Sequence, residues 1–171
     1  SGDVTHTSLV PTMLQQLLEV REGLSVPPTL KCLLVGGAAA GKDLVETALR
    51  KGYPIALTYG TTEACSQVAT APPKLVRTKA DAVGPPLDGI ELRLRDSGEI
   101  CIRGVTVSQD VVDEDGWFAT GDLGVLDDDG HLRVTGRLSD RIISGGVNVD
   151  PLFVETVMRK LPGVAAVAVV G

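Results

Sequence analysis

An alternation of apolar runs and small-residue turns in the first third of the chain constrains its fold more than any other feature. The apolar run over residues 30–35 is typical of a buried parallel strand, and the stretch GGAAAG follows it directly. Apolar side chains then recur at helical spacing over residues 44–49, before Gly52, and a second strand is expected over residues 55–59. This order predicts a crossover unit of an α/β fold, whose ligands bind at the carboxyl ends of its strands.

A further helix is expected before this unit, over residues 11–22. Pro11 would open it, Ser8 is its predicted cap, and Leu14, Leu17 and Leu18 recur at helical spacing along it. One face of this helix is therefore expected to cover the sheet.

The stretch GGAAAGKD matches the phosphate loop of nucleotide triphosphatases at every position but the last. Gly36, Gly41 and Lys42 fit the pattern G-x-x-x-x-G-K, but Asp43 stands where a Ser or Thr hydroxyl would bind magnesium. Its negative charge would face the phosphates that such a loop binds. The sequence therefore disfavours a triphosphatase, although the small side chains of residues 38–40 let a flat group approach the backbone closely.

The pattern changes after residues 71–73. Residues 91–95 and 99–103 alternate between apolar and polar side chains around the turn Asp96-Ser97-Gly98, which predicts a β-hairpin. A second hairpin is expected from Asp122 to Thr135, so residues 84–137 read as a small antiparallel β module. Its acidic turn, residues 127–130, lacks the spaced ligands and terminal Glu of a calcium loop, and we interpret it as ordinary turn chemistry.

The last part of the chain, residues 138–171, contains one predicted helix and one predicted strand. Asp150 caps and Pro151 opens the helix, and residues 164–170 form the strand. This segment is too short to bury a core of its own, so it is either a cut domain or packs on a missing part. We therefore divide the chain into residues 1–83, 84–137 and 138–171.

Composition limits the classes of partner. The chain has 171 residues, 43% of them hydrophobic, and a net charge of −6 without a basic stripe, which argues against nucleic acid and favours small molecules. Its apolar segments fall short of the roughly 20 residues that a membrane span needs. The 3 cysteines, Cys32, Cys65 and Cys101, lie in or beside apolar runs, and we expect buried free thiols in a reducing cytoplasm rather than metal ligands.

Three segments in order carry a resemblance to a known family. They are YGTTEACS at residues 59–66, GWFATGDLGVLDDDGHLRVTGR at residues 116–137 and DRIISGGVNVDP at residues 140–151. The chain resembles the adenylate-forming superfamily, which comprises acyl-CoA synthetases, luciferases and peptide-synthetase adenylation domains. Within it, TSLVPTMLQQLL, LLVGGAAA and YGTTEACSQV look most like the o-succinylbenzoate:CoA ligases of menaquinone synthesis.

The resemblance implies a fold and a set of roles. The fold would be α/β (α+β): the βαβ end of the large domain, a small antiparallel β module and the start of the mobile carboxy-terminal domain. Carried over residue by residue, the catalytic positions are Thr62 and Glu63, with Glu63 also the magnesium ligand. The positions implied to bind the nucleotide are Gly36, Gly37 and Ala38 at adenine, Tyr59 stacked on it, Asp122 at the ribose and Arg137 at the ribose or phosphate, together with Gly60 and Thr61. Thr61 and Thr62 would donate to the α-phosphate or to the acyl carboxylate.

Two further roles follow from the resemblance. Ser139 corresponds to the hinge of the mobile domain, where many relatives have Asp or Lys. Ser144, Gly145 and Gly146 would line the pantetheine tunnel for CoA. The residue patterns leave plainer alternatives open: a tight turn for the glycines, a hairpin-turn residue for Asp122, a half-buried strand tyrosine for Tyr59 and a surface arginine for Arg137.

The implied activity is ATP-dependent ligation of a carboxylic acid to CoA through an acyl-adenylate, with ATP, Mg²⁺ and CoA, and a homo-oligomer of the full-length form is left open. The family's phosphate loop, of the form T-S-G-T-T-G-x-P-K, and its catalytic lysine are not among these residues. We therefore interpret the chain as an internal fragment that is inactive alone. The alternatives are another medium-chain or aromatic acyl-CoA synthetase, a ligase that acylates a carrier protein, or a noncatalytic nucleotide-binding module.

Overall fold

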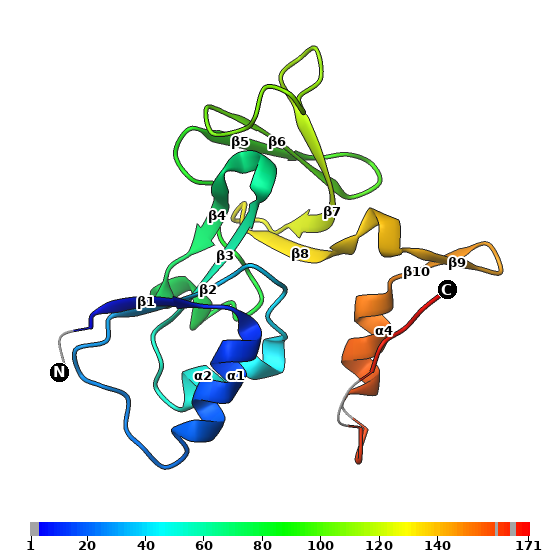
Figure 1. The fold of residues 1–171 in the computed structure, drawn as a ribbon. Coiled ribbons are helices and arrows are strands. Elements are labelled where there is room, and N and C mark those ends of the chain that lie inside the picture. Colours follow the sequence, from blue (N-terminus) through cyan, green and yellow to red (C-terminus); the bar gives the residue numbers. More distant parts are fainter. Residues whose placement is uncertain (1–3, 160, 165–166) are drawn as a thin grey trace.

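The computed structural model describes residues 4–159, 161–164 and 167–171, and its elements form an α/β fold with three sheets (Figure 1). Two sheets have four strands each, and the third is a two-stranded hairpin. The strands are β1 (His6–Leu9), β2 (Cys32–Val35), β3 (Ile55–Thr61), β4 (Ser66–Ala71), β5 (Ile90–Leu94), β6 (Glu99–Gly104), β7 (Phe118–Leu126), β8 (Leu132–Arg137), β9 (Ile142–Ser144) and β10 (Val147–Val149). The helices are α1 (Pro11–Val20), α2 (Lys42–Arg50), α3 (Pro73–Val76) and α4 (Pro151–Met158), with the 3-10 turns η1 (Thr62–Ala64) and η2 (Leu138–Asp140).

The first sheet contains the predicted crossover unit. Strands β1, β2 and β3 are parallel neighbours, and α1 and α2 lie side by side against them (Figure 1). Leu14 of α1 and Val45 of α2 are fully buried in one core with Leu33 and Ile55 of the strands. The apolar periodicity of both helices is therefore used as expected, to cover one sheet.

Strand β1 was not expected, and it corrects the predicted cap of α1. Its residues are mostly exposed at the edge of the sheet, so they carry no apolar signal. Ser8 belongs to this strand and pairs with Leu34, while Val10 precedes the helix without a side-chain hydrogen bond. The helix also ends at Val20, before the expected Glu22.

Strand β4 was also not expected, and it returns antiparallel to β3. The register shifts by one residue between Tyr59 and Gly60, which is a β-bulge. A Cβ atom at Gly60 would lie 1.9 Å from the carbonyl oxygen of Ser66. Only glycine fits there, because the two backbones cross too closely for any side chain.

The second sheet is the antiparallel module, with strand order β5-β6-β7-β8. Both predicted hairpins are confirmed: β5 pairs with β6, and β7 pairs with β8 around the acidic turn. Gly84 joins this module to the first sheet through a bridge to Leu132, and a Cβ atom there would lie 2.4 Å from the Thr70 backbone. The two sheets therefore meet backbone to backbone.

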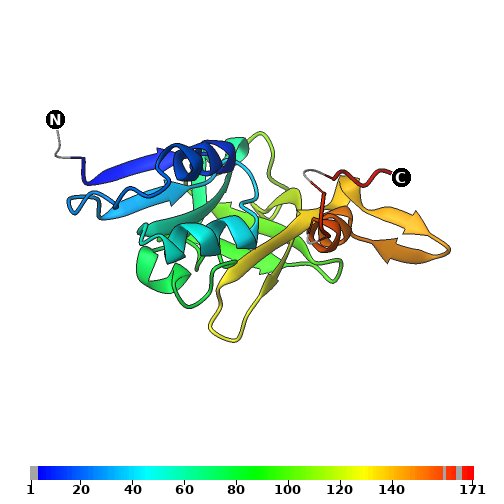
Figure 2. The same ribbon diagram turned by 90° about the horizontal axis from the view of Figure 1, so that it is seen from below.

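The carboxy-terminal part lies beside β8, with the β9–β10 hairpin projecting away from the body (Figures 1 and 2). Asp150 caps α4 as predicted, because its Oδ1 accepts the Leu152 amide at 3.0 Å. The strand expected over residues 164–170 is wrong for residues 164 and 167–170, which are not in a strand; residues 165 and 166 lie outside the described residues. This segment instead contacts α4, where the Val169 amide donates to Oε1 of Glu155 at 3.1 Å. No helix in the described ranges has the length and apolar character needed to cross a bilayer.

Candidate functional site

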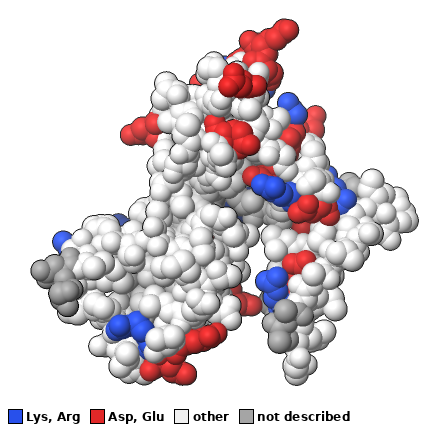
Figure 3. Space-filling view, viewed as in Figure 1, with Lys and Arg blue, Asp and Glu red and all other residues white. Residues whose placement is uncertain are grey.

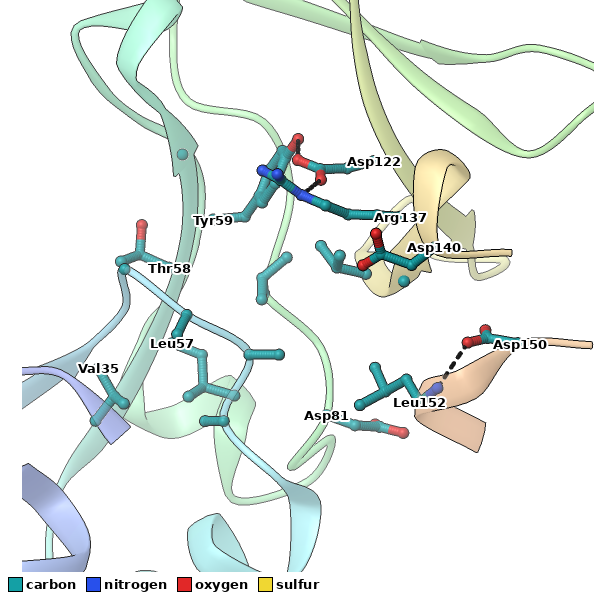
Figure 4. Close-up of a pocket in the computed structure, with 18 of the residues that line it drawn as sticks. Val35, Leu57, Thr58, Tyr59, Asp81, Asp122, Arg137, Asp140, Asp150 and Leu152 are labelled. Atoms are coloured by element: carbon teal, nitrogen blue, oxygen red, sulfur yellow. Dashed lines mark hydrogen bonds and ion pairs between the residues drawn. The ribbon is translucent and has the colours of Figure 1, made fainter. Parts of the chain in front are cut away.

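A cleft of about 390 Å³ opens where the first sheet, the β module and α4 meet (Figure 4). One wall is the turn after β2 together with the end of β3, and the opposite wall is β8 and the start of α4. Figure 3 shows the notch between the body and the α4 limb from the same side as Figure 1, with acidic and basic side chains interspersed over this face. The cleft therefore lies at the carboxyl ends of the parallel strands, where the crossover pattern predicted a ligand.

The glycine turn after β2 contributes backbone to this cleft. Gly37 adopts a φ of +79°, which favours glycine, and Gly37 and Ala38 both line the cleft. Gly36 faces the other way: a Cβ atom there would lie 2.5 Å from Cγ2 of Thr58. The missing side chain at Gly36 thus allows β2 and β3 to approach, a packing reason that the sequence pattern did not suggest. Lys42 is exposed at the first residue of α2.

Three residues that are far apart in the sequence form a hydrogen-bonded cluster at the upper end of the cleft (Figure 4). The Tyr59 hydroxyl donates to Oδ2 of Asp122 at 2.8 Å, and Nε of Arg137 donates to Oδ1 of Asp122 at 2.9 Å. Asp122 is only 7% exposed, and it lies opposite Arg137 in the β7–β8 ladder. The guanidinium therefore neutralises a buried carboxylate, and that carboxylate keeps lone pairs for further donors.

Burial sets the protonation of Tyr59. The phenol is 8% exposed, and burial is the main cause that raises its pKa, with the neighbouring Asp122 carboxylate also raising it. The hydroxyl thus remains a donor throughout the ordinary pH range. The ring contacts the core of the β module, which agrees with the alternative of a buried strand tyrosine, and it also lines the cleft. Its stacking on a base stays a prediction.

A second, wider cleft of about 860 Å³ lies on the other side of the same wall. Thr61, Thr62 and Glu63 line it from the end of β3 and η1, and residues 8–10 of the first strand and its loop face them. Gly37, Thr58, Gly60, Asp122 and Arg137 border both clefts. The Tyr59–Asp122–Arg137 cluster therefore stands at the junction of two adjoining spaces.

Glu63 is held as an anion at the rim of this second cleft. Thr61 Oγ1 donates to Oε2 of Glu63 at 2.7 Å, and this bond is the main cause that lowers the pKa of the carboxyl, with the more distant Arg137 charge adding to it. The Glu63 carbonyl accepts the Ser108 amide at 2.7 Å, which ties η1 to the β module. The predicted residues Thr61 and Glu63 are thus brought together, while Thr62 beside them is exposed.

Cys65 corrects the expectation that all three cysteines are buried. Cys101 is buried and Cys32 is partly buried, but Cys65 is exposed on the turn that follows η1. Its φ of +59° is the one positive value of a residue other than glycine in the described part of the chain. The apolar neighbours Ala64 and Val68 suggested burial, but the tight reversal from η1 into β4 turns this side chain outward.

The predicted hinge and CoA residues lie outside both clefts. Ser139 sits in η2, where its hydroxyl donates to Oδ1 of Asp140 at 2.8 Å. Ser144, Gly145 and Gly146 form the exposed turn of the β9–β10 hairpin, and the two glycines have φ values of +58° and +81°. A two-residue turn of this kind requires glycine for its backbone alone, so the turn alternative has a direct structural basis.

The acidic turn between β7 and β8 forms ion pairs with Lys79. Oδ1 of Asp127 accepts the amides of Asp129 and His131 at 3.0 and 2.9 Å, which is the turn chemistry expected. Nζ of Lys79 contacts Asp127 at 2.5 Å and Asp129 at 2.6 Å. Asp127, Asp129 and His131 are close enough to share a cation, and in this structure that cation is the ammonium group.

Several residues that line the first cleft were not predicted. Asp81 precedes the β module, Asp140 lies in η2, and Asp150 and Glu155 come from α4. Asp150 could be identified only as a helix cap, because nothing in the sequence shows that α4 returns to β8. The contact depends on Gly136, where a Cβ atom would lie 3.2 Å from Oδ1 of Asp150.

Comparisons with known proteins match this part of the molecule to one family. The family model described as AMP-binding enzyme matches residues 2–110. The 2-succinylbenzoate–CoA ligase of Bacillus cereus strain Q1 is 40% identical over 186 residues, which cover 98% of this chain and 39% of that protein. The chain therefore spans about two fifths of the length of the curated relatives that it matches.

Two solved structures of o-succinylbenzoate CoA synthetase from Bacillus subtilis share the fold. One, in complex with the acyl-adenylate intermediate OSB-AMP, has a TM-score of 0.89 at 38% identity, over 99% of this chain and 38% of that one. The other, in complex with ATP and magnesium ion, has a TM-score of 0.87 at 39% identity, over 99% of this chain and 39% of that one. On the family match, and with this agreement in fold, the chain belongs to the AMP-binding enzyme family.

Proposed function

We propose that residues 1–171 form the nucleotide-binding part of an ATP-dependent carboxylate:CoA ligase. The observation that carries the proposal is the Tyr59–Asp122–Arg137 cluster at the junction of two clefts, with the Thr61–Glu63 pair on the same strand end. A phenol, a buried carboxylate and a guanidinium lie beside the Thr61 hydroxyl and the Glu63 carboxylate, which suits a ligand that carries both a sugar and a phosphate.

The first cleft suits the adenosine half of the nucleotide. The backbone of Gly37 and Ala38 and the ring of Tyr59 line it, so a flat base fits between them, with Gly36 behind the turn and Gly60 at the strand end. Asp122 accepts one hydrogen bond on each oxygen and retains lone pairs for the two ribose hydroxyls. We therefore assign the base to the glycine turn and the ribose to Asp122.

Charge favours the second cleft for the phosphates. Four carboxylates line the first cleft near α4 and would repel an anion: Asp81, Asp140, Asp150 and Glu155. The second cleft offers the hydroxyls of Thr61, Thr62 and Ser66, and Arg137 borders it. A nucleotide with its base in the first cleft would thus direct its phosphates past Arg137 into the second.

Glu63 fits the requirements of a magnesium ligand. Its pKa is lowered, so it is ionised at neutral pH, and it lies in the cleft assigned to the phosphates. Mg²⁺ commonly binds through one or two carboxylates together with substrate phosphates and water. When bound there, the ion would neutralise the charge that builds on the phosphate oxygens.

The reaction that these residues serve has two steps. A substrate carboxylate oxygen attacks the α-phosphorus of ATP, and the bond to pyrophosphate breaks, which gives an acyl-adenylate. The thiol sulfur of CoA then attacks the acyl carbon, and AMP leaves with the electron pair of the broken carbon–oxygen bond. Thr61, Thr62 and Arg137 would donate to the oxygens on which charge develops. Ser139 would be the hinge between the steps, and Ser144, Gly145 and Gly146 would line the CoA path.

We further propose that the acid is o-succinylbenzoate, which would place the enzyme in menaquinone synthesis. The names of the relatives in Bacillus cereus and Bacillus subtilis support this acid. The free thiols Cys32, Cys65 and Cys101 agree with a cytoplasmic location. Homo-oligomerisation of a longer form stays a prediction.

The proposal is tested first on the chain itself. We expect AMP to bind in a calorimetric titration, because both clefts are formed by these residues. We also expect no acid-dependent pyrophosphate exchange, because residues 1–171 do not include the phosphate loop and the lysine that would position the reacting groups. Exchange activity would contradict the prediction of inactivity, and absence of AMP binding by the folded chain would contradict the nucleotide site.

The acid is tested on a longer enzyme that contains these residues. AMP release would be measured with o-succinylbenzoate, substituted benzoates and fatty acids, each with CoA or with a carrier-protein thiol. The expected result is the highest kcat/KM with o-succinylbenzoate and CoA. A higher kcat/KM with another acid, or with the carrier protein, would contradict the proposed substrate but not the proposed nucleotide site. AMP binding without any ligation would favour a noncatalytic nucleotide-binding module.

A further inference from the structure

A bulge in β7 spans residues 120–122 and includes Asp122. Between β6 and β7 the register runs from Glu99 opposite Leu123 to Cys101 opposite Ala119, so two steps on β6 correspond to four on β7. Ile100 alone on β6 therefore faces Thr120, Gly121 and Asp122 on β7, and Gly121 adopts a φ of +74°. Such bulges re-aim side chains, and here one of these side chains is that of Asp122.

Side chains replace the backbone ladder throughout this bulge. Oε1 of Glu99 accepts the Gly121 amide at 3.2 Å. The Thr120 hydroxyl donates to the Ile100 carbonyl at 2.9 Å and accepts the Asp122 amide at 3.1 Å. The amides of Gly121 and Asp122 are thus satisfied by the side chains of Glu99 and Thr120.

Glu99 is an unusual residue for its position. It is 7% exposed, and its neighbours Ile100 and Ile102 on the strand are fully buried. Its other oxygen, Oε2, accepts from Nη1 of Arg95 at 2.8 Å, so the buried charge is paired. An apolar residue would suit the core better, but it would leave the Gly121 amide without this acceptor.

We infer that Glu99 is a positioning residue, whose carboxylate holds the Gly121 bulge and thereby aims Asp122 at the ribose. Glu99 lines neither cleft and acts through the backbone of β7. The inference rests on the proposed nucleotide site. It adds that the affinity for the ribose hydroxyls depends on a carboxylate outside that site.

The experiment compares AMP with 2′,3′-dideoxy-AMP on the folded chain by calorimetric titration. In the wild type we expect AMP to bind roughly tenfold more tightly, because only AMP offers the hydroxyls to Asp122. Glu99→Leu should reduce this ratio to about twofold or less. Glu99→Gln should keep most of the ratio, because its amide oxygen still accepts from Gly121 while the half-exposed Arg95 turns to solvent.

A purely structural role predicts a different result. It would weaken both nucleotides equally in Glu99→Leu and leave their ratio unchanged, which would overturn the inference. Glu91→Leu is the matched control, because Glu91 is also ion-paired on this sheet, with Arg103 at 2.7 Å, but its carboxylate is exposed and remote from the bulge. That control should leave the ratio at the wild-type value.

If Glu99→Leu does not fold, Glu99→Asp provides a second test of the inference. Glu99→Asp retains the charge beside Arg95 but withdraws the oxygen from the Gly121 amide, so the ratio should again fall. A wild-type ratio in folded Glu99→Asp would overturn the inference. If the wild-type chain does not bind AMP at all, the proposed nucleotide site is wrong. This result differs from an unchanged ratio in the Glu99 variants, so failure of the site and failure of the inference can be told apart.

Discussion

Two regions of the chain differ in how their side chains are buried. Every residue described as buried lies between Leu14 and Leu132, and two apolar cores in this stretch underlie the first sheet and the β module. The residues with a described burial in 138–147, 149–159, 161–164 and 167–171 include no buried one, and Phe153 of α4 is 70% exposed. The first region therefore forms a packed platform, whereas the second rests against it without a core of its own.

Two contacts between the regions are polar. Oδ1 of Asp150 lies over Gly136 of β8, and Nη2 of Arg141 donates to the Ser97 carbonyl at 3.4 Å. The Tyr59–Asp122–Arg137 cluster belongs wholly to the first region, while the second supplies one acidic wall of the first cleft. The hydrogen bonds of the Tyr59–Asp122–Arg137 cluster therefore do not depend on the second region.

The same substitution in the two regions should give the largest contrast. Gly60→Ala places a methyl group 1.9 Å from the Ser66 carbonyl, so the paired strands must separate. We expect a loss of about 3 kcal/mol or more in the free energy of unfolding, measured by urea denaturation. Gly146→Ala meets no atom within 4 Å, and its φ of +81° costs about 1–2 kcal/mol locally.

Comparing Gly60→Ala with Gly146→Ala shows whether the two regions unfold as one cooperative unit. Because none of the described residues after Arg137 belongs to either core, Gly146→Ala should leave the main unfolding transition unchanged. Equal destabilisation by both substitutions would show that the hairpin is part of the cooperative unit, and the comparison would fail.

The second largest effect is expected from Asp122→Ala, which should weaken AMP binding. Asp122→Ala removes the acceptor for the ribose, and about 1.5–3 kcal/mol for a charged hydrogen bond corresponds to a roughly tenfold to hundredfold rise in the AMP dissociation constant. Calorimetric titration measures it. The structure adds a stability cost, because Tyr59 loses the partner of its buried hydroxyl.

Asp122→Asn is therefore the matched variant, since it keeps the shape and one acceptor. It should fold with a melting temperature closer to that of the wild type and bind AMP with intermediate affinity. Wild-type affinity in a folded Asp122→Ala variant would exclude Asp122 from the site.

The sequence predicted the elements whose signals are local. The crossover unit, both hairpins and the Asp150 cap follow from periodicity and turn residues, and the strand ends correctly located the clefts. Strands β1 and β4 were missed because β1 is an exposed edge and because β4 depends on a bulge at Gly60 that only a close backbone crossing explains.

The candidate site was predicted as a set of residues rather than as a geometry. The resemblance named Tyr59, Asp122 and Arg137, but no pattern shows that Asp122 bonds to both of the others. Glu99 also escaped detection, because a Glu at the start of an alternating strand is typical of a solvent-facing position. Its role depends on a register shift between strands, which sequence periodicity does not reveal.

A smaller effect is expected from removing the second region. A chain that ends at Arg137 keeps both cores and the whole hydrogen-bonded cluster, so its melting temperature should stay within a few degrees of that of the full chain. Its AMP affinity should change by less than about fivefold, or about 1 kcal/mol, because the lost wall of the first cleft is mainly acidic. Circular dichroism and calorimetry measure both quantities, and unfolding on truncation would refute the independence of the platform.

The smallest effect should come from the Lys79 tether, which joins the segment after α3 to the β7–β8 turn within the platform. Hydrogen bonding by Lys79 is the main cause that lowers the pKa of Asp127, and the same contact raises the pKa of Lys79. The lowered carboxyl pKa stabilises the fold above the unfolded Asp value of about 3.9, and this contribution is lost as the pH falls through the folded value. The raised lysine pKa contributes fully below the unfolded value of about 10.4, and this contribution is lost as the pH rises through the folded value.

Lys79→Met should therefore lower the melting temperature slightly at pH 7, and the difference from the wild type should shrink as the pH is reduced from about 5 to about 2. Asp127→Asn should behave like Lys79→Met, while Asp128→Asn on the exposed side of the same turn should not. A pH-independent difference would show that Lys79 acts through packing of its alkyl chain rather than through charge.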